Sequence, residues 1–389
     1  MVNVAILGFG TVGSGVAEVL TGHESSIERK AEGLIRLKYI LDVRDFPDSP
    51  FAGRFVKDFG VIENDPEVDI VVETIGGAGV ALDFTRRALA AGKSVVTSNK
   101  ELVAAHGYEL TQAAKEKGVC YLFEASVGGG IPIIRPLSQC LAANEILEIY
   151  GILNGTTNYI LTRMVKGGVT FAEALKEAQS KGYAEANPAA DVEGLDAGRK
   201  ICILSDLAWG REVRPEAISI QGISHLDLRD VDIASRAGYR VKLLGRALRL
   251  EDGRQAAYVA PHLVPADCPI APVDDVFNAI MIRGNAVGDV MFYGRGAGDL
   301  PTASAVMGDV LDALAHRNRR RDLGWSEDAP LIDQERDLPL YWYLRGDLAR
   351  PAGGEKLAEG AYIVGPLSAQ AAKELAEQVK AAALMPVLR

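Results

Sequence analysis

The feature that most constrains the fold is a glycine-rich turn placed directly between a strand and a helix. Residues 8–13 read Gly-Phe-Gly-Thr-Val-Gly, preceded by the β-branched run Val4–Leu7 and followed by a helical apolar face at Val16, Val19 and Leu20. In such a turn the first two glycines let backbone amides approach a pyrophosphate, and the third lets helix and strand pack closely. The order predicts a dinucleotide-binding unit; a tight turn that binds nothing is the alternative.

The segments after this turn alternate between strand and helix patterns. Strands are expected at residues 37–43, 68–74, 94–97 and 119–123, with helices at 83–91 and 108–117. This alternation predicts an α/β fold with a Rossmann-type, doubly wound, mostly parallel sheet. Ligands bind beyond the carboxyl ends of such strands, and Ser98-Asn99-Lys100 stands at one of them. We therefore expect Lys100 to face the cofactor crevice; without that placement it would be a surface lysine.

The end of the second predicted strand bears on the choice of nicotinamide cofactor. It reads Asp42-Val43-Arg44. An acid at this position usually binds the ribose 2′-hydroxyl of NAD, whereas an arginine accommodates the 2′-phosphate of NADP. Both types occur, so these residues alone leave NAD and NADP open, and either residue alone is also typical of a solvated turn.

Length and composition exclude several classes of protein. A chain of 389 residues exceeds what one hydrophobic core usually supports, and a net charge of −10 argues against a nucleic-acid surface. The basic run Arg317–Arg321 sits beside acids and is expected to end a helix. No signal peptide and no membrane-spanning apolar run is evident, which predicts a soluble, cytoplasmic protein. A reducing compartment also suits the four cysteines, which are spread singly: Cys120, Cys140, Cys202 and Cys268.

From about residue 130 the pattern changes. The glycine-rich junction 124–132 leads into a predicted helix at 132–141 and a strand at 145–153. The strand ends in Asn154-Gly155-Thr156-Thr157-Asn158-Tyr159, which could hold a small substrate or the nicotinamide, or simply cap the next helix. Further strands at 239–249 and 255–263 predict a mixed sheet in a second, α+β domain.

Several charged side chains that could take part in catalysis or binding lie between residues 182 and 200. Asp196 and Lys200 are four residues apart, so on a helix they share one face. An exposed ion pair there would contribute only a few tenths of a kcal/mol. However, the apolar run 201–204 follows Lys200 and predicts a largely buried helix. Burial lowers the pKa of a lysine and makes it useful for proton transfer.

At this point the chain resembles homoserine dehydrogenase. The matching stretches occur in the family's order and cover roughly the first 320 residues. They are GFGTVGSGV at 8–16, TSNKELVA at 97–104, FEASVGGGIPII at 123–134, GILNGTTNYIL at 151–161, GYAEANPAADVEGLDAGRK at 182–200 and GRGAGDLPTASAV at 294–306.

The resemblance implies a reaction and a set of residues. The reaction is the reduction of L-aspartate 4-semialdehyde to L-homoserine, and its reverse, in threonine, methionine and isoleucine biosynthesis. Lys200 would be the proton donor and acceptor, with Lys100 and Asp196 beside it as catalytic residues. The substrate positions are Glu185, Asp191, Asp196, Gly155 and Thr156. The cofactor positions are Gly8, Phe9, Gly10, Thr11, Val12, Gly13, Arg44, Lys100 and Gly298; the string 43–45 resembles the family's 2′-phosphate site and favours NADP. A monovalent cation, usually sodium, would be held by Glu124 and the carbonyls of Val127, Gly129 and Ile131.

The resemblance also bears on domain organisation. We expect a Rossmann domain at 1–130, completed by about 296–322, and a catalytic and dimerisation domain at 131–295 that forms a homodimer or homotetramer. Many family members carry an ACT domain at the C-terminus, which is linked to feedback inhibition by threonine. Here residues 323–389 predict strands at 340–345, 361–364 and 385–388 and a helix at 368–383, without the expected Asp-x-Pro-Gly turn. They are interpreted as a shortened, ACT-like domain.

Two other functions are consistent with parts of the sequence. An aspartate-semialdehyde dehydrogenase-like oxidoreductase would need a nucleophilic cysteine with a histidine base. A non-catalytic dinucleotide sensor would retain the glycine turn but would have no need for Lys100, Asp196 and Lys200.

Overall fold

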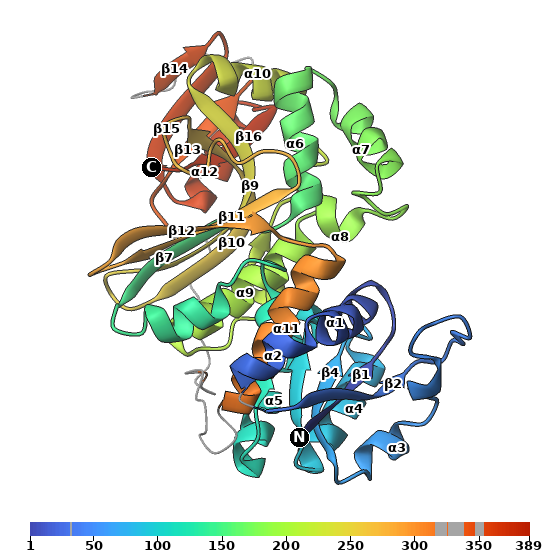
Figure 1. Cartoon of the computed structure of the whole chain (residues 1–389). Coiled ribbons are helices and arrows are strands. Elements are labelled where there is room, and N and C mark those ends of the chain that lie inside the picture. The colour runs from blue at the N-terminus through green and yellow to red at the C-terminus, as the bar shows by residue number, and fades with distance from the viewer. Residues whose placement is uncertain (32, 316–324, 326–337, 347–353) are drawn as a thin grey trace. The chain divides into compact units, whose positions relative to one another are not determined.

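The computed structural model describes residues 1–389 except 32, 316–324, 326–337 and 347–353 (Figure 1). The chain forms two compact units, which are described separately. Unit 1 comprises Met1–Cys140, Leu207–Glu212 and Arg295–Glu327, and unit 2 comprises Leu141–Asp206, Val213–Gly294 and Asp328–Arg389.

Unit 1 is built on a fully parallel sheet, sheet A. Its strands are β1 (Val2–Leu7), β2 (Ile35–Leu41), β3 (Phe55–Val56), β4 (Val68–Glu73), β5 (Ser94–Thr97) and β6 (Tyr121–Leu122). They run in the order β3-β2-β1-β4-β5-β6. The strand order reverses between β1 and β4, which is the topological switch point where such sheets bind ligands. The predicted doubly wound parallel sheet is confirmed.

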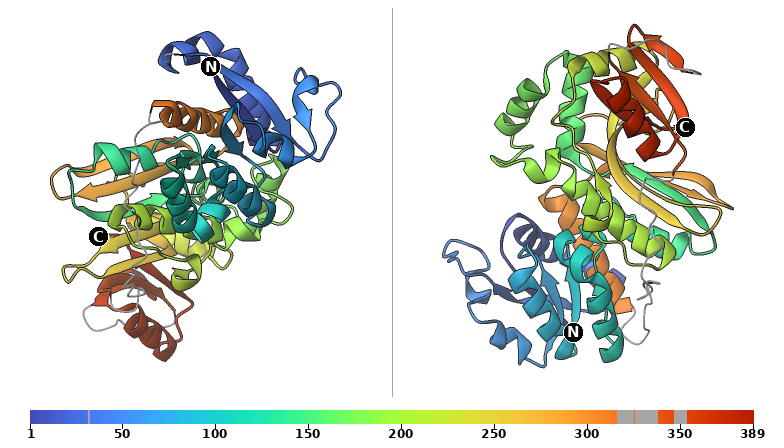
Figure 2. Two further views of the ribbon diagram at one scale, coloured as in Figure 1. Left: turned by 90° about the horizontal axis from the view of Figure 1, so that it is seen from below. Right: turned by 180° about the vertical axis from the view of Figure 1, so that it is seen from behind.

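Helices cover both faces of sheet A (Figure 2). They are α1 (Thr11–Gly22), α2 (Glu24–Ala31), α3 (Phe59–Glu63), α4 (Gly79–Ala90), α5 (Lys100–Lys117) and α11 (Asp299–Ala315). One core joins Val4 and Ile6 of β1 to Val16 of α1 and Val306 of α11, all without solvent exposure. The late helix α11 therefore packs with the first strand and first helix of the chain.

The helix expected at 132–141 is present in a shorter form, at residues 134–140. Its main part, Pro136–Cys140, is π-helical. The amides of Ile133, Ile134 and Arg135 bond to the carboxylate of Glu124. Pro136 is tolerated in the first turn, because an amide hydrogen there would have no partner within the helix. The first turn of the predicted helix thus gives its donors to a side chain earlier in the chain.

Unit 2 is built on a mixed sheet, sheet B. Its strands are β7 (Ile146–Ile152), β8 (Ser219–Ile220), β9 (Tyr239–Arg249), β10 (Gln255–Pro265), β11 (Phe277–Gly284), β12 (Gly288–Arg295), β13 (Leu340–Arg345), β14 (Glu355–Ala358), β15 (Ala361–Leu367) and β16 (Ala383–Val387). Nine of them follow the order β12-β11-β7-β9-β10-β16-β13-β15-β14, and β8 pairs with β10. The predicted mixed sheet of an α+β domain is confirmed.

The helices of unit 2 carry the polar residues discussed below. They are α6 (Gly155–Gly167), α7 (Phe171–Ser180), α8 (Ala189–Val192), α9 (Leu195–Trp209), α10 (Leu228–Arg236) and α12 (Ala369–Gln378). Helix α6 follows β7 directly, and its N-cap is Asn154. Helix α9 follows α8 after two residues, so the segment 189–209 runs almost entirely as helix.

The C-terminal segment joins sheet B and is attached to α10. Tyr343 Oη donates to Asp230 Oδ1 at 2.7 Å, and the guanidinium of Arg345 donates to both oxygens of the same carboxylate. Trp342 packs with Tyr258 of β10 in one core. The segment has one strand more than expected, β14, and a shorter helix, α12. Its interpretation as an ACT-like domain stays a prediction.

Three further expectations concern the basic run, membrane-spanning helices and the cysteines. The basic run 317–321 lies outside the described residues. None of the helices in the described part of the chain is long and apolar enough to cross a membrane. All four cysteines are described, and none of them forms a disulfide.

Candidate functional site

The glycine turn after β1 has the close contacts that its glycines predict. Gly8 has φ +90°, and a Cβ on Gly13 would lie 2.0 Å from the Gly8 carbonyl oxygen. A Cβ on Gly10 would meet no atom within 4 Å, which leaves its outer side open for a ligand. Gly10 is the N-cap of α1, and no side chain caps the helix there. The first amides of α1, at Thr11 and Val12, are thus left for a phosphate.

Thr74, directly after β4, holds this turn in place. Its hydroxyl lies 3.0 Å from the carbonyl oxygen of Leu7 and 2.9 Å from that of Gly8. A Cβ on Gly8 would also approach the Thr74 carbonyl to 2.9 Å. Sequence reasoning missed Thr74, because its role depends on a contact between strands that are far apart in the chain.

At the end of β2, Asp42 is used within the protein. Its side chain is 6% exposed and accepts from the amides of Phe9 (2.7 Å) and Arg44 (2.9 Å). The Arg44 guanidinium donates to both carboxylate oxygens, at 3.1 and 3.0 Å. The side-chain hydrogen bond from Arg44 holds the pKa of Asp42 well below its usual range. Asp42 therefore fixes Arg44, whose side chain remains 58% exposed.

A hollow of about 390 Å³ lies beside the glycine turn. Its lining includes Gly8, Gly10, Asp42, Arg44 and Lys57. Lys57 was not predicted; its ammonium lies 3.1 Å from the Val43 carbonyl and 2.8 Å from Asp45. The hollow thus combines the turn with two cations, Arg44 and Lys57, which suits a phosphorylated ligand.

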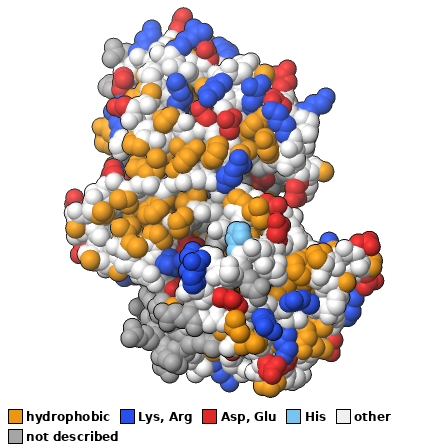
Figure 3. All heavy atoms as spheres, in the orientation of Figure 1, with side chains coloured by type: hydrophobic (Ala, Val, Ile, Leu, Met, Phe, Trp, Pro, Cys, Tyr) orange, Lys and Arg blue, Asp and Glu red, His pale blue; other side chains and the backbone are white. Residues whose placement is uncertain are grey.

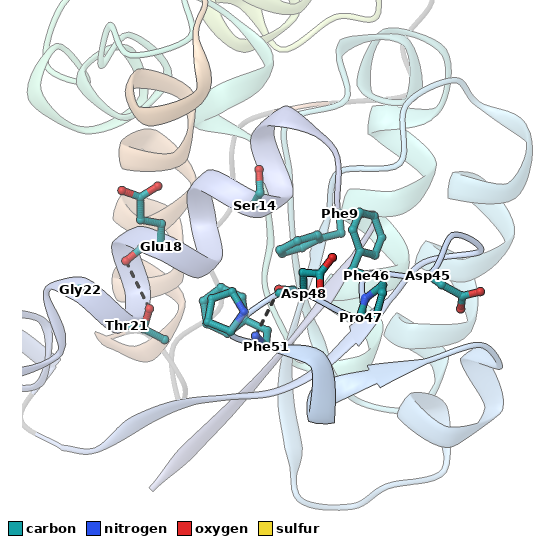
Figure 4. A pocket seen from close by; sticks show the side chains of 12 residues that line it. Phe9, Ser14, Glu18, Thr21, Gly22, Asp45, Phe46, Pro47, Asp48 and Phe51 are labelled. Carbon is teal, nitrogen blue, oxygen red and sulfur yellow. Dashed lines mark hydrogen bonds between the residues drawn. The ribbon is translucent and has the colours of Figure 1, made fainter.

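Phe9 belongs to the glycine turn, and its side chain lines a second hollow of about 780 Å³ together with Phe46 and Phe51 (Figure 4). Its ring meets those of Phe46, Phe51 and Phe55 edge to face, with centroids 5.0, 6.1 and 5.1 Å apart. This packing ties the turn to the segment after β2. The ring of Phe9 therefore stabilises the glycine turn, in addition to the cofactor-binding role predicted for this residue.

Lys100 and Gly298 both lie next to helix N-termini of unit 1. Lys100 is the first residue of α5, and Asn99 caps that helix by accepting from the Leu102 amide at 3.1 Å. The Asn99 amide group also donates to the Gly77 carbonyl at 2.6 Å. Lys100 is half-buried and follows β5 after two intervening residues; that it faces the cofactor stays a prediction. Gly298, with φ +124°, directly precedes α11.

The predicted cation site centres on Glu124, whose carboxylate is buried and already engaged. It accepts from three successive amides at 2.6, 2.7 and 2.7 Å. Behind it, Asp309 accepts from the Glu124 amide and from Arg135, both at 2.7 Å. Burial and the neighbouring Glu124 raise the pKa of Asp309 to about 7. In this arrangement Glu124 fits the role of an anchor for the loop better than that of a cation ligand.

In unit 2, the predicted Asp196–Lys200 pair is formed and buried. The Lys200 ammonium donates to Asp196 Oδ2 and to the Leu153 carbonyl, both at 2.7 Å. Lys200 is 7% exposed and Asp196 2%. The alternative of an exposed ion pair is therefore wrong. A buried charge of this kind requires such partners, because its desolvation is costly.

Asn154 joins the pair to a further predicted substrate residue, Asp191. Its amide nitrogen donates to Asp191 Oδ1 at 2.7 Å and to Asp196 Oδ2 at 2.9 Å. The structure thus brings Asp191, Asp196 and Lys200 into one hydrogen-bonded cluster around Asn154. The sequence left open whether the segment from Asn154 holds a ligand or caps the next helix; Asn154 does cap α6, and its bonds to Asp191 and Asp196 were not predicted.

Of the other predicted substrate residues, Gly155 and Thr156 follow Asn154 directly, and Glu185 has no hydrogen bond to the described residues of this cluster. A Cβ on Gly155 would approach the Val276 carbonyl to 2.7 Å, and Thr156 Oγ1 donates to the Tyr183 carbonyl at 2.6 Å. The side chain of Glu185 is exposed, and its backbone carbonyl accepts from Gln179 at 3.1 Å. The structure does not include the Glu185 carboxylate in the bonded cluster.

Two of the four cysteines are poorly placed to be the nucleophile that an aspartate-semialdehyde dehydrogenase requires. Cys120 and Cys202 are buried. Burial raises the pKa of the Cys202 thiol well above its usual value, which disfavours the reactive thiolate. The described residues contain no group of three or more His, Cys, Asp or Glu side chains that could hold a metal.

Comparisons with known proteins agree on one family. The family model for the homoserine dehydrogenase NAD-binding domain matches residues 8–124, and that for homoserine dehydrogenase matches 132–311. The homoserine dehydrogenase of Neisseria gonorrhoeae is 44% identical over 80% of this chain and 72% of its own. That of Pseudomonas aeruginosa is also 44% identical, over 88% and 81%.

Solved structures agree with the sequence relatives. A homoserine dehydrogenase from Thiobacillus denitrificans matches with a TM-score of 0.91 and 37% identity, over 100% of this chain and 98% of that one. A hyperthermophilic archaeal homoserine dehydrogenase in complex with NADPH matches with a TM-score of 0.68 and 30% identity, over 81% and 98%. These matches support an oxidoreductase acting on CH–OH over the thiol-dependent and non-catalytic alternatives. The chain belongs to the homoserine dehydrogenase family.

Proposed function

We propose that Lys200 is the proton donor and acceptor in the reduction of L-aspartate 4-semialdehyde to L-homoserine and in its reverse. The observation that carries this assignment is the burial of the Lys200 ammonium between the Asp196 carboxylate and the Leu153 carbonyl. Two acceptors in a buried place keep the ammonium in one position. A fixed, poorly hydrated cation stabilises a developing alkoxide more strongly than the same cation in water.

The chemistry follows from that placement. In the reduction, Lys200 Nζ would donate one proton to the carbonyl oxygen of the aldehyde, which becomes the hydroxyl, and a bound nicotinamide would supply the hydride to the aldehyde carbon. In the reverse direction, neutral Lys200 would accept the hydroxyl proton, and the oxidised cofactor would take up the hydride. Lys100, at the first turn of α5, is the second lysine of the proposal and would assist in placing cofactor and substrate.

The substrate's ammonium group calls for carboxylates. Asp191 and Asp196 lie in the bonded cluster, and Glu185 is proposed as a third, more exposed contact. Gly155 and Thr156 begin α6 and offer backbone amides and a hydroxyl at the same strand end. Opposite charge and a helix N-terminus together suit a small amino-acid substrate with one positive and one negative end.

NADP is the proposed cofactor. The main support is the internal use of Asp42, whose carboxylate oxygens accept from Phe9 and Arg44 and are thereby drawn away from a ribose hydroxyl. Two cations, Arg44 and Lys57, line the same hollow and suit a 2′-phosphate. When bound, the nicotinamide supplies the hydride, and the protein supplies position and charge.

A monovalent cation at the glycine-rich junction 124–132 remains part of the proposal, with the Glu124 carboxylate no longer among its ligands. The carbonyls of Val127, Gly129 and Ile131 would supply its ligands, with Glu124 holding the loop through its three amide contacts. Because the Glu124 carboxylate fits the anchoring role better, no step of the reaction is derived through the cation.

We also propose that a second copy of the chain covers one edge of sheet B. Strand β12 pairs with β11 and ends the strand order. Four large apolar side chains on and near this edge are exposed: Leu147, Val287, Met291 and Tyr293. Figure 3 shows hydrophobic side chains gathered over this part of unit 2. Exposed apolar patches of this kind are typical of subunit interfaces.

Lys200→Ala tests the proton-transfer role. We expect kcat for homoserine oxidation to fall by at least about 10²-fold, the usual loss of a general acid or base, with NADPH affinity nearly unchanged. Lys200→Arg should remain slow, because a guanidinium keeps the charge but does not release its proton at working pH. Lys166→Ala, which removes an exposed lysine paired with Asp274, is the control. An active Lys200→Ala variant would refute the assignment.

A further inference from the structure

We infer that Asn154 is a positioning residue that sets the charge state and orientation of Lys200 through Asp196. This inference rests on the proposed role of Lys200 and adds a residue to it. Asn154 is 6% exposed and follows β7 as the N-cap of α6. It therefore connects the end of β7 and the start of α6 with residues of α8 and α9 in one hydrogen-bonded cluster.

All polar atoms of the Asn154 side chain are used. Oδ1 lies 2.9 Å from the Thr157 amide and 3.1 Å from its hydroxyl. Nδ2 donates its two hydrogens to Asp191 Oδ1 and Asp196 Oδ2. The reversed amide would set its oxygen against two carboxylates and its nitrogen against an amide donor, so the chemistry of the partners fixes this orientation.

Asp196 Oδ2 is shared between two donors. It accepts from Asn154 Nδ2 at 2.9 Å and from Lys200 Nζ at 2.7 Å. A neutral amide that donates to a carboxylate disperses part of its charge, so the same oxygen attracts the lysine proton less strongly. Asn154 thus makes it easier for Lys200 to give up its proton, while the carboxylate stays ionised.

The charged groups bonded in this cluster come from two helices. Asp191 lies on α8, and Asp196 and Lys200 lie on α9. The strand end contributes the neutral Leu153 carbonyl and the Asn154 amide. In the contacts described here, Asp196 bonds to Lys200 and Asp191 bonds to Asn154, and the two amide hydrogens of Asn154 offset part of the charge of the two carboxylates.

Asn154→Asp is the most informative variant. It is nearly the same size and keeps an acceptor for the Thr157 amide, since Asp is a good N-cap. It removes both donors and adds a third carboxylate beside Asp191 and Asp196. Asn154→Ser keeps a cap oxygen, removes the bridge and adds no charge. Ser368→Ala, which removes the cap of α12 elsewhere in unit 2, is the control for cap loss alone.

The test measures Lys200 directly as well as turnover. Acylation of Lys200 by a small anhydride is followed by mass spectrometry across pH, together with kcat, KM and NADPH affinity. We expect the labelling midpoint to rise by at least about one pH unit in Asn154→Asp and less in Asn154→Ser, as for a lysine given an extra negative neighbour. The alkaline rise of kcat for homoserine oxidation should move with it, and kcat at pH 8 should fall at least about tenfold.

The outcomes separate this inference from the proposed function. An unchanged labelling midpoint in Asn154→Asp, with NADPH affinity intact, would overturn the positioning role. Equal losses of kcat in the Asn154 variants and in Ser368→Ala would also overturn it, because cap loss alone would then account for the effect. If the midpoint moves but the unmodified enzyme does not oxidise homoserine, the positioning role stands and the proposed function fails.

Discussion

Replacing His262 with glutamine is expected to make the protein more resistant to mild acid. His262 lies on β10 and is fully buried. Its Nδ1 lies 2.8 Å from the Ala260 carbonyl, which requires a hydrogen there, and its Nε2 then accepts from Tyr258 Oη at 3.2 Å. Arg246 is bonded to the same Tyr258 hydroxyl and adds a positive charge nearby. The site therefore accommodates a neutral imidazole and opposes a charged one.

The magnitude follows from the difference between folded and unfolded states. Burial and the Arg246 charge lower the pKa of His262 from 6.5 to about 3. Because the folded pKa is depressed, the contribution to stability is complete above pH 6.5 and is lost as the pH falls toward 3, while the unfolded chain binds a proton. At pH 5, which is about 1.5 units below the pKa of His262 in the unfolded chain, protonation lowers the free energy of the unfolded state by about 2 kcal/mol. The free energy of unfolding falls by the same amount.

Urea unfolding at pH 7.5 and pH 5.0 measures this effect. The unmodified protein should lose about 2 kcal/mol more than His262→Gln between the two pH values, since glutamine does not titrate. His225→Gln, an exposed histidine of the same unit, is the matched control and should behave like the unmodified protein. Equal acid losses in His262→Gln and the unmodified protein would show that His262 is not held neutral, and the reasoning would fail.

Three further predictions concern cofactor, regulation and assembly. Arg44→Ala should raise the KM for NADPH by about tenfold or more and change that for NADH little, because it removes a charged phosphate partner; an unchanged NADPH to NADH ratio of kcat/KM would make Arg44 a bystander. Threonine at millimolar concentration should inhibit weakly or not at all, and deleting residues 335–389 should reduce stability or assembly more than regulation. Cooperative inhibition that disappears with the deletion would contradict this. Light scattering should find a dimer or tetramer, reduced in size by Tyr293→Lys on the exposed edge; an active monomer at micromolar concentration would refute the interface.

The features that could be predicted from sequence depend on short spacings. The glycine turn depends on contacts between residues that lie within six positions of one another, and its strand and helix form as predicted. The Asp196–Lys200 pair follows from a spacing of four residues, and it forms within one helix. In each case the residues that interact are held together by local backbone geometry, so the pattern alone contains the information.

The features that were missed depend on long separations. Asn154 meets Asp191 and Asp196 across 37 and 42 residues, and Thr74 meets Gly8 across 66. The bonds of Glu124 to the amides of Ile133, Ile134 and Arg135, at the start of the helix predicted at 132–141, were missed for the same reason. Helix α5 begins at Lys100, eight residues before its predicted start, since Asn99 provides a cap that the apolar pattern alone did not indicate.

The position of β16 has a consequence for how the protein is made. This strand is synthesised after every other strand of sheet B, yet it lies in the interior of the sheet, between β10 and β13. Leu263 of β10 pairs with Val387, and Tyr341 of β13 pairs with the same residue from the other side. Until β16 has been made, β10 and β13 therefore each have unpaired backbone groups along the edge that β16 will occupy. Another nascent chain can pair with such an edge. Sheet B is therefore complete only when β16 has been made, and a premature stop upstream of β16 would leave the edges of β10 and β13 that face it unpaired.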